Sequence, residues 1–443
     1  MKISPAATLT GLAQLSAIKR YLIAYSGGLD SHVLLHALSD TRDILKGAII
    51  EAVHVNHGLS PNAKKWALHC EQQCASLGIL LHHVSVDAQA QKGESREAAA
   101  RNARYQAIAA LMKIGDCLLT AHHQDDQAET LLLQLLRGAG PKGLAAMPLV
   151  AEFSSAWHAR PLLSLNRDEL QQYANQHALE WIDDESNFDT GFDRNFLRHE
   201  ILPLLKTRFP AAAETLSRSA SLCAEAAELL TASAMTDIDE LMLGENTLSV
   251  SRLLVLGETR ARNVLHQWIH AVGFPVPTAA QTQRIWQDAI CSAVDSCPLV
   301  SWPGAELRRY RDELFIGEPL TEFDSTQIFS WQPETKLDID GLGCLSVASV
   351  TGQGISPEYF TGKPVEVRFR QGGEALRPVG REGHHALKKL FQETGIPPWS
   401  RERIPLLFIN DELAMVAGNW VAHEFAVTPE EEGLLPVWVP LAG

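Results

Sequence analysis

Short apolar runs alternate with longer amphipathic stretches through the first half of the sequence. The first run, residues 21–25, carries no charge and is rich in β-forming side chains, so it predicts a strand buried on both faces. Further strands are predicted at 48–55, 79–87 and 117–121. Between them, apolar side chains recur three and four residues apart, which is typical of helices. Strands that alternate with helices predict an α/β domain with a mostly parallel, doubly wound sheet.

The turn between the first strand and the first helix has a composition suited to phosphate. Its residues are Ser26, Gly27, Gly28, Leu29, Asp30 and Ser31. The glycines let backbone N–H groups approach an anion, and the following helix adds the positive end of its dipole. Ser31 is predicted to be the N-cap of that helix. The loop lacks the lysine and the spacing of a Walker A motif.

A second polar string follows the fourth predicted strand. Residues 122–130 are His-His-Gln-Asp-Asp-Gln-Ala-Glu-Thr and are predicted to begin a helix. Asp126 and Glu129 lie three residues apart and therefore share one face of that helix. Carboxylates beside a phosphate loop repel ATP unless a divalent cation lies between them, so we expect Mg²⁺ at Asp126, Glu129 and Asp30. Taken singly, each acid could equally be a helix cap or a solvated residue.

Histidines and an arginine are further candidates near the same edge of the sheet. His54 and His57 come at the end of the second predicted strand, where open α/β sheets bind ligands, so they could contact the nucleotide or simply pack in the core or a turn. Arg101 lies on the helix after the third strand. It could hold phosphate oxygens, or it could form an ordinary surface ion pair with Glu97.

The second half of the chain has a different texture. A long Ala/Leu-rich helix is predicted at 211–235, followed by helices at 260–270 and 278–293 and a strand-like run at 306–316. Short β-prone runs begin near residue 335, and basic residues exceed acids within 367–403, where Phe391 and Trp399 are interleaved with them as on an RNA-binding surface. We expect three domains: α/β at 1–212, mainly helical at 213–325, and small α+β at 326–443.

Composition narrows the class of protein. The chain has 443 residues and a formal net charge of −15, which still permits nucleic-acid binding through a local basic face. Its 7 cysteines are scattered without a C-x-x-C pair, which argues against a disulfide framework or a cysteine-rich zinc module and fits a reducing cytoplasm. No segment approaches the length of a membrane span, so no membrane partner is expected.

The motifs together resemble a known family. Ser-Gly-Gly-Leu-Asp-Ser at 26–31 resembles the pyrophosphate-binding loop of the N-type ATP pyrophosphatases, the PP-loop superfamily. With Ala-Val-His-Val-Asn-His-Gly at 52–58 and the string at 122–130, the chain resembles the tRNA(Ile)-lysidine synthetases. Shorter matches continue at 160–163, at 184–187 and at Arg194, Asn195 and Arg198. The residues from 365 onward also resemble the C-terminal domain of the longer members.

The resemblance implies a fold, an activity and roles for particular residues. It implies a PP-loop α/β domain that uses ATP and Mg²⁺ to adenylate the wobble cytidine of a tRNA(Ile) with a CAU anticodon, after which free L-lysine displaces AMP. The implied catalytic residues are Asp30, Asp126, Glu129, Arg101 and Arg194. The implied ATP-binding residues are those of 26–31 with His54, His57 and His122. The oligomeric state stays open, with a homodimer as one option.

Two other functions compete with this one. Another PP-loop enzyme, such as a tRNA thiolation enzyme or an amidotransferase synthetase, would share the phosphate loop. Thiolation branches use catalytic cysteine pairs, and Cys70 and Cys74 are predicted to have neither that spacing nor a position beside the loop. A non-catalytic RNA-binding protein with a degenerate nucleotide fold is the second alternative, and the intact strings at 26–31 and 122–130 argue against it.

Overall fold

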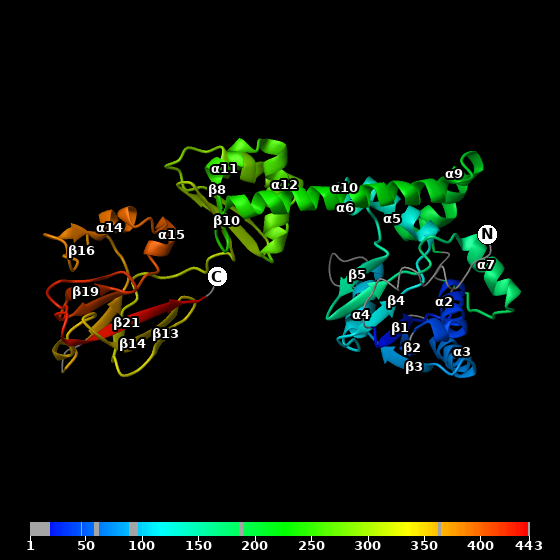
Figure 1. Ribbon diagram of the computed structural model, residues 1–443, viewed down its shortest axis with the longest axis horizontal. Coiled ribbons are helices and arrows are strands. Elements are labelled where there is room, and N and C mark those ends of the chain that lie inside the picture. The colour runs from blue at the N-terminus through cyan, green and yellow to red at the C-terminus, as the bar shows by residue number, and fades with distance from the viewer. Residues whose placement is uncertain are drawn as a thin grey trace. The chain divides into compact units, whose positions relative to one another are not determined.

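A six-stranded sheet organises the first part of the chain (Figure 1). Its strand order is β3-β2-β1-β4-β6-β5, in which β5 pairs antiparallel with β6 and all other neighbours are parallel. The strands are β1 (Arg20–Ala24), β2 (Ile49–Asn56), β3 (Leu80–Ser85), β4 (Asp116–Leu119), β5 (Val150–Phe153) and β6 (Ala156–Ala159). The mostly parallel sheet predicted from the sequence is confirmed.

The computed structural model describes residues 18–45, 47–56, 62–87, 96–183, 185, 189–361 and 365–441. Within it the chain divides into two units, Met1–Ala232 and Ser233–Gly443, and each is described by itself. No helix among the described residues is long and apolar enough to span a lipid bilayer.

Helices cover both faces of the sheet in the first unit. They are α2 (Leu29–Asp40), α3 (Ala63–Ser76), α4 (Arg96–Ala109), α5 (Gln124–Leu136), α6 (Pro141–Leu144), α7 (Arg167–Gln176), α8 (Asp193–Phe196) and α9 (Leu202–Arg208). Tyr21 and Ile23 of β1 pack into a core with α2, α3 and α7, whereas Leu22 packs into a second core with α4. The strand is therefore buried on both faces, which explains its continuous apolar run.

The strand order places two loops side by side. β1 pairs with β2 on one side and with β4 on the other, so that Tyr21 lies opposite both Ile50 and Cys117. The strand order therefore reverses between β1 and β4, because β2 and β3 are added on one side of β1 and the later strands on the other. Since β1 and β4 are parallel, the loops that follow them leave the same edge of the sheet. Open α/β sheets bind their ligands at such a switch point.

The predicted cap of the first helix is wrong. α2 begins at Leu29 with Gly28 as its N-cap, three residues earlier than a Ser31 cap would allow. Ser31 lies inside the first turn, where its hydroxyl donates to the carbonyl oxygen of Gly28 at 3.0 Å. The glycine leaves the first N–H groups of the helix without a side-chain cap, which keeps them available to an anion.

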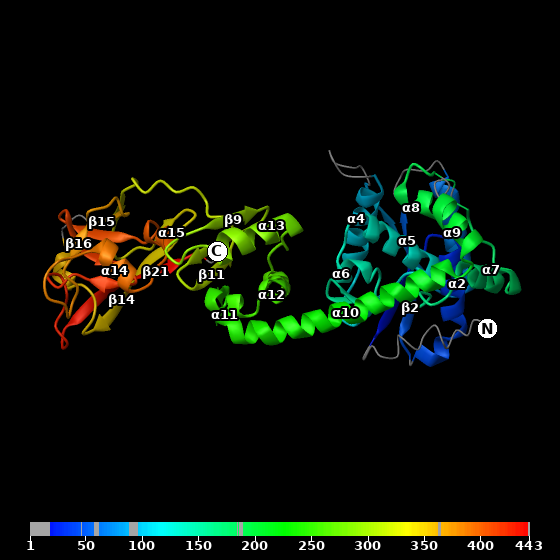
Figure 2. The ribbon, with the colours of Figure 1, turned by 90° about the horizontal axis from the view of Figure 1, so that it is seen from above.

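A long helix spans the division between the units. α10 (Ala212–Leu241) is one uninterrupted helix of 30 residues (Figure 2). The helix predicted at 211–235 is confirmed and continues for six more residues, as the end at Leu241 shows.

The middle region combines helices with a five-stranded sheet. Its helices are α11 (Val250–Val255), α12 (Glu258–Ala271) and α13 (Ala279–Arg284), which continues as a π-helical segment, Ile285–Ile290. The sheet has the order β7-β8-β11-β10-β9, with β7 (Met242–Gly244), β8 (Thr247–Ser249), β9 (Leu299–Trp302), β10 (Ala305–Tyr310) and β11 (Glu313–Gly317). The run predicted as one strand at 306–316 is instead a hairpin, because the chain turns at Arg311, whose φ is 57°.

The C-terminal region is built from two larger sheets and a short ribbon. One sheet contains β12 (Phe329–Trp331), β15 (Val365–Arg368), β18 (Leu406–Ile409), β19 (Glu412–Val416) and β20 (Trp420–Val421). The other contains β13 (Leu337–Ile339), β14 (Gly343–Thr351) and β21 (Glu432–Pro440), and the ribbon pairs β16 (Ala375–Leu376) with β17 (His385–Ala386). The helices are α14 (Leu387–Glu393) and α15 (Pro398–Arg401).

The cores of the second unit bear on two predictions. One cluster lies within residues 234–316 and another within 331–425, while the three-domain division at 212 and 325 stays a prediction. Phe391 is fully buried in the second cluster, so its predicted exposure to RNA is wrong. Trp399 instead packs edge-on against Phe315 of β11.

Candidate active site

The loop after β1 is held in shape by its two serines. The hydroxyls of Ser26 and Ser31 lie 3.1 Å apart, and the backbone N–H of Gly28 donates to Ser26 Oγ at 3.3 Å. The backbone N–H of Ser26 donates to Ser31 Oγ at 3.3 Å. These bonds close the loop on itself at the start of α2, where the helix dipole favours a negative charge.

Gly27 is the one position of the loop that only glycine fits. Its φ is +84°, and a Cβ there would lie 2.9 Å from Cys70 Sγ and 3.0 Å from Ile182 Cδ1. The Gly27 carbonyl also accepts a hydrogen bond from the backbone N–H of Ile182 at 2.9 Å. Ile182 therefore supports the phosphate loop through both its side chain and its backbone.

The acidic string after β4 begins α5 with a reciprocal cap. His123 is the N-cap, and its Nδ1 accepts from the backbone N–H of Asp125 at 3.2 Å. In return Asp126 Oδ2 accepts from the backbone N–H of His123 at 2.9 Å. Burial lowers the pKa of His123, but the carboxylates of Asp126, Asp30 and Asp125 raise it by more, so the net shift is upward.

Two arginines from a distant segment pair with the acids of α5. Arg194 donates from Nε to Glu129 Oε2 at 2.7 Å and from Nη2 to Asp126 Oδ1 at 3.0 Å. Arg198 donates from Nε to Glu129 Oε1 at 2.6 Å and from Nη2 to Asp126 Oδ1 at 2.8 Å. Arg198 lies in a π-helical segment, Leu197–Ile201, that continues α8. We call these four residues the acid–arginine cluster.

Charge in the cluster fixes the ionisation of Asp126. Burial alone would raise the pKa of this carboxyl, but the charges of His123, Arg194 and Arg198 hold it well below the usual range. Glu129 is fully buried, and both of its oxygens accept from guanidinium groups. The cluster is thus a compensated group of two carboxylates and two guanidiniums at the switch point of the sheet.

A row of neutral histidines lies beside the cluster. Burial, with the nearby charge of Arg160, lowers the pKa of His158 to about 3, and burial likewise lowers that of His122 to about 3. Arg160 Nη2 donates to His158 Nδ1 at 3.3 Å, so the ring proton of His158 is on Nε2, which donates to Thr120 Oγ1 at 2.9 Å. Thr120 in turn donates to His122 Nδ1 at 2.8 Å. His122 is therefore held by a fixed chain of hydrogen bonds.

Asp30 differs from the other two predicted metal ligands. Its Oδ1 is buried and makes no hydrogen bond among the described residues. A carboxylate oxygen without a partner, in the first turn of the phosphate-loop helix, fits one ligand of a Mg²⁺ ion whose other ligands are phosphate oxygens and water. Asp126 and Glu129 are already paired with arginine, so direct binding of Mg²⁺ to them would displace a guanidinium.

The carboxylate oxygens of Asp30, Asp126 and Glu129, all described residues, do not form a set within 4.8 Å of one another. Among the described residues, His36, Asp40 and His177 are the one set of three whose ligand atoms all lie within 4.8 Å of one another. That set is on α2 and the end of α7. The binding of Mg²⁺ by Asp30, Asp126 and Glu129 stays a prediction.

The remaining predicted residues lie around the same edge. The Nδ1 of His54, which is buried, donates to the Tyr25 carbonyl at 3.0 Å, so the side chain supports the entry to the phosphate loop. Arg101 lies close enough to His122 and His158 for its charge to lower the pKa of both, after the larger effect of burial. His57 lies outside the described residues.

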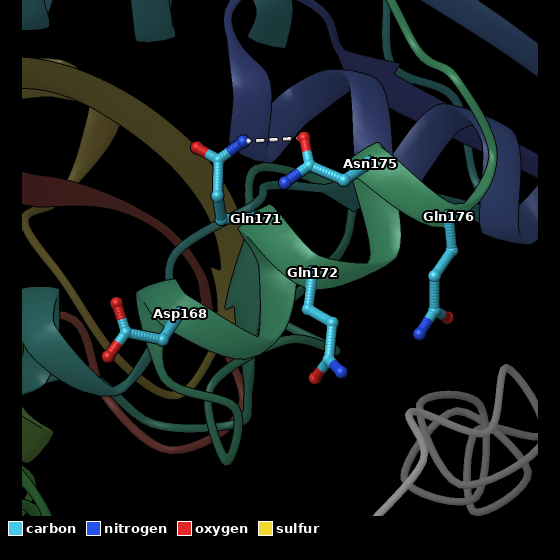
Figure 3. Close-up of a pocket in the computed structure, with 5 residues that line it drawn as sticks. All are labelled: Asp168, Gln171, Gln172, Asn175 and Gln176. Carbon is cyan, nitrogen blue, oxygen red and sulfur yellow. Dashed lines mark hydrogen bonds between the residues drawn. The ribbon is translucent and has the colours of Figure 1, made fainter.

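A pocket along α7 is separate from these residues. It is lined by Asp168, Gln171, Gln172, Asn175 and Gln176, and Gln171 Nε2 donates to Asn175 Oδ1 at 3.2 Å (Figure 3). All five side chains come from one helix and only one of them is ionisable.

Comparisons with known proteins identify the domains of the chain. A model described as a PP-loop domain matches residues 5–205, one described as a TilS substrate binding domain matches 248–315, and one described as a TilS substrate C-terminal domain matches 365–438. The tRNA(Ile)-lysidine synthase of Methylococcus capsulatus is 43% identical over 427 residues, 95% of this chain and 96% of that protein. That of Coxiella burnetii is 42% identical over 431 residues, 97% of this chain and 95% of that protein.

The chain belongs to the tRNA(Ile)-lysidine synthase family. It is an ATP-dependent ligase, as the PP-loop domain and these relatives indicate together. The family resemblance seen in the motifs is therefore confirmed, and the alternative of a non-catalytic RNA-binding protein is wrong.

The cysteines of this synthase argue against the thiolation alternative. Cys70 and Cys74 are buried on α3, and burial raises the pKa of both thiols to about 12. A thiol that stays protonated is a poor nucleophile. The prediction that neither cysteine lies beside the phosphate loop is wrong for Cys70, whose Sγ would lie 2.9 Å from a Cβ at Gly27, because α3 folds back under the loop.

Sequence reasoning missed the role of two residues in this synthase. Lys206 of α9 pairs with Asp125 Oδ1, which a separation of 81 residues in the chain conceals. The sequence did contain a signal for His123, because this residue stands at the start of the predicted helix, where an N-cap is expected. Histidine is not among the preferred N-cap residues, so its presence there indicates a second task.

Proposed function

We propose that the enzyme ligates free L-lysine to C2 of the wobble cytidine of a tRNA(Ile) with a CAU anticodon, at the expense of ATP. In the first step the C2 carbonyl oxygen attacks the α-phosphorus of ATP and pyrophosphate leaves. In the second, the ε-amine of lysine attacks C2 and AMP leaves. The named relatives support the product, and the PP-loop domain supports the use of ATP.

The phosphate loop is proposed to hold the departing pyrophosphate. The first N–H groups of α2 have no side-chain cap, and Ser26 and Ser31 offer hydroxyls on the same loop. Arg101 and His122, beside the end of β4, are proposed to contact the α-phosphate, where negative charge grows during attack. His122 is neutral at physiological pH and can donate one hydrogen bond from Nε2, because its Nδ1 accepts from Thr120.

The acid–arginine cluster is the observation that carries the proposal for lysine. Free lysine has a carboxylate and two ammonium groups, and the cluster offers both complementary charges in one place. Arg194 and Arg198 are suited to the carboxylate, and Asp126, whose side chain is 10% exposed, to an ammonium group. Glu129 is fully buried and holds the two guanidiniums in place. A site that served ATP alone would have no need of two buried carboxylates beside the phosphates.

The ionisation of Asp126 decides whether this residue binds the ammonium group of lysine or accepts a proton from it. Attack on C2 needs the free ε-amine, so lysine must lose one proton first. A carboxylate whose pKa is held well below its usual range is a weak base. We therefore assign Asp126 to holding the ammonium group and not to accepting its proton.

Mg²⁺ is proposed to bind at Asp30, whose Oδ1 has no hydrogen-bond partner among the described residues. The ion would offset the negative charge of the phosphates beside the loop. The second unit is proposed to hold the tRNA, which agrees with the two substrate-domain models that match it. We also propose that the enzyme works in the cytoplasm, which the scattered cysteines of the sequence support, and that it forms a homodimer.

One assay tests the proposed function. The full-length enzyme is mixed with ATP, Mg²⁺, [¹⁴C]lysine and unmodified tRNA(Ile) with a CAU anticodon, and label in RNA is compared with AMP released. We expect equal amounts of both, and none in RNA when the wobble cytidine is replaced by uridine. AMP without label in RNA, or label that is indifferent to that base, would contradict the proposal.

A further inference from the structure

His123 connects the two loops that meet at the switch point. It lies in the loop after β4 and caps α5, with Nδ1 accepting from the Asp125 N–H at 3.2 Å. Its backbone N–H donates to Asp126 Oδ2 at 2.9 Å. The ring is 1% exposed, so its other nitrogen must face protein or ligand and not solvent.

The proton on that other nitrogen follows from the cap. A ring nitrogen that accepts a hydrogen bond carries no proton, so the neutral ring carries its proton on Nε2. The protonated ring also carries a proton there. In both forms Nε2 is a hydrogen-bond donor.

Nε2 faces two carboxylates that come from different elements. It lies 3.6 Å from Asp30 Oδ2, on the first turn of α2, and 3.5 Å from Asp126 Oδ2. Among the described residues it makes no hydrogen bond, although it is buried, and neither does Asp30 Oδ1. Nε2 thus lies just beyond hydrogen-bonding distance of Asp30 Oδ2, and a small movement of that carboxylate when the site is occupied would bring the two atoms together.

We propose that His123 is a positioning residue for the attack on ATP. Its Nε2–H group orients the Asp30 carboxylate, and its backbone N–H orients Asp126. Asp126 already has a backbone donor and two guanidiniums. Among the described residues Asp30 Oδ1 has no hydrogen-bond partner, so this carboxylate gains more from the Nε2–H group. The inference rests on the proposed function, because it assigns Asp30 to the ATP step.

Capping and positioning can be separated by substitution. His123→Asn and His123→Ser keep an oxygen that can cap α5, but neither side chain reaches Asp30. His123→Ala loses the cap as well. Thr278→Ala is the matched control, because Thr278 caps α13 in the second unit with the same reciprocal geometry and lies outside the PP-loop domain.

The measurements are the thermal midpoint, and kcat and KM for ATP in tRNA-dependent pyrophosphate release. For His123→Asn and His123→Ser we expect kcat to fall by about tenfold to 100-fold, with KM for ATP within about twofold and the midpoint within about 2 °C of wild type. Thr278→Ala should lower the midpoint and, with tRNA at a saturating concentration, leave kcat for pyrophosphate release unchanged. A capping role alone predicts wild-type kcat in the Asn and Ser variants, and that result would overturn the proposal.

A double variant asks whether His123 acts through Asp30. In the Asp30→Asn background, His123→Asn should give no further loss in single-turnover pyrophosphate release, because the carboxylate that it positions has gone. Losses that multiply would show two independent roles and would also overturn the proposal. Failure of the wild-type enzyme to make lysidine would instead count against the proposed function, so the two failures are distinguishable.

Discussion

Arg198 donates two hydrogen bonds to Glu129, which lies 69 residues earlier in the chain. Nε is 2.6 Å from Oε1, and Nη2 is 2.9 Å from Oε2. Glu129 is fully buried, so its charge depends on this guanidinium and on Arg194. Removal of one partner leaves a buried charge under-compensated, which is costly in a low-dielectric interior. This pairing joins the segment after α7 to the acidic helix and so completes the site.

Arg198→Ala should therefore destabilise the PP-loop domain. We expect a loss of about 3 kcal/mol in the free energy of unfolding, measured by urea denaturation. Arg284→Ala is the control, since its ion pair with Asp288 is exposed at 60% and 55%, and it should cost less than about 0.5 kcal/mol. Equal losses in the two variants would contradict the account of the cluster.

Gly27→Ala should damage the phosphate loop more than backbone strain alone explains. Gly27 and Gly138 both have positive φ, 84° and 71°, but a Cβ at Gly138 meets nothing within 4 Å. Gly138→Ala should cost about 1 kcal/mol through strain. Gly27→Ala adds the clash with Cys70 and Ile182, so we expect a larger loss of stability by denaturation and weaker binding of ATP by calorimetry.

His158 should make stability depend on pH. Burial lowers its pKa to about 3, so below the ordinary value of 6.5 the unfolded chain binds a proton that the folded state does not. Stability is therefore lost as pH falls from 6.5 towards 3. Between pH 7 and pH 5 this residue should account for about 2 kcal/mol of that loss. The loss should shrink by that amount in His158→Gln and stay unchanged in the exposed control His270→Gln.

Asp126→Asn should affect lysine more than ATP. The variant removes one carboxylate that is proposed to hold an ammonium group, so KM for lysine should rise by roughly 100-fold. Transfer of label from [α-³²P]ATP to tRNA without lysine should persist. The exposed control Glu225→Gln should match wild type, and an unchanged KM for lysine in Asp126→Asn would remove this residue from the lysine site.

Asp30→Asn should raise the Mg²⁺ concentration needed for half-maximal pyrophosphate release. The amide keeps the shape of the side chain but offers a neutral oxygen, which binds a hard cation more weakly. A magnesium titration of variant and wild type measures the shift. An identical requirement in both would place the ion elsewhere.

The sequence was most informative where a single local pattern determined the structure. The uncharged run before Ser26 predicted β1, and the glycines after it predicted an anion-binding turn. Asp126 and Glu129 could be placed on one helix face because helical spacing is local. The start of α2 was predicted wrongly because the sequence does not distinguish a serine at the N-cap from a serine inside the first turn.

Contacts between distant segments could not be predicted in the same way. Nothing local to Arg194 and Arg198 indicates that both pair with Asp126, because the pairing needs the segment after α7 to fold back on α5. The turn at Arg311 could not be predicted, because few non-glycine residues adopt a positive φ and the residues on either side form one β-prone run. The position of His123 Nε2, buried and without a hydrogen-bond partner among the described residues, is likewise visible only in three dimensions.

The most direct test of the account is mass spectrometry of the wobble nucleoside. The tRNA(Ile) is incubated with enzyme, ATP, Mg²⁺ and [¹³C₆,¹⁵N₂]lysine, digested to nucleosides and separated by liquid chromatography. The account predicts a cytidine derivative at the wobble position that contains the labelled lysine joined through its ε-nitrogen, and an adenylated cytidine when lysine is omitted. An unmodified wobble cytidine, or lysine attached at another nucleotide, would contradict it.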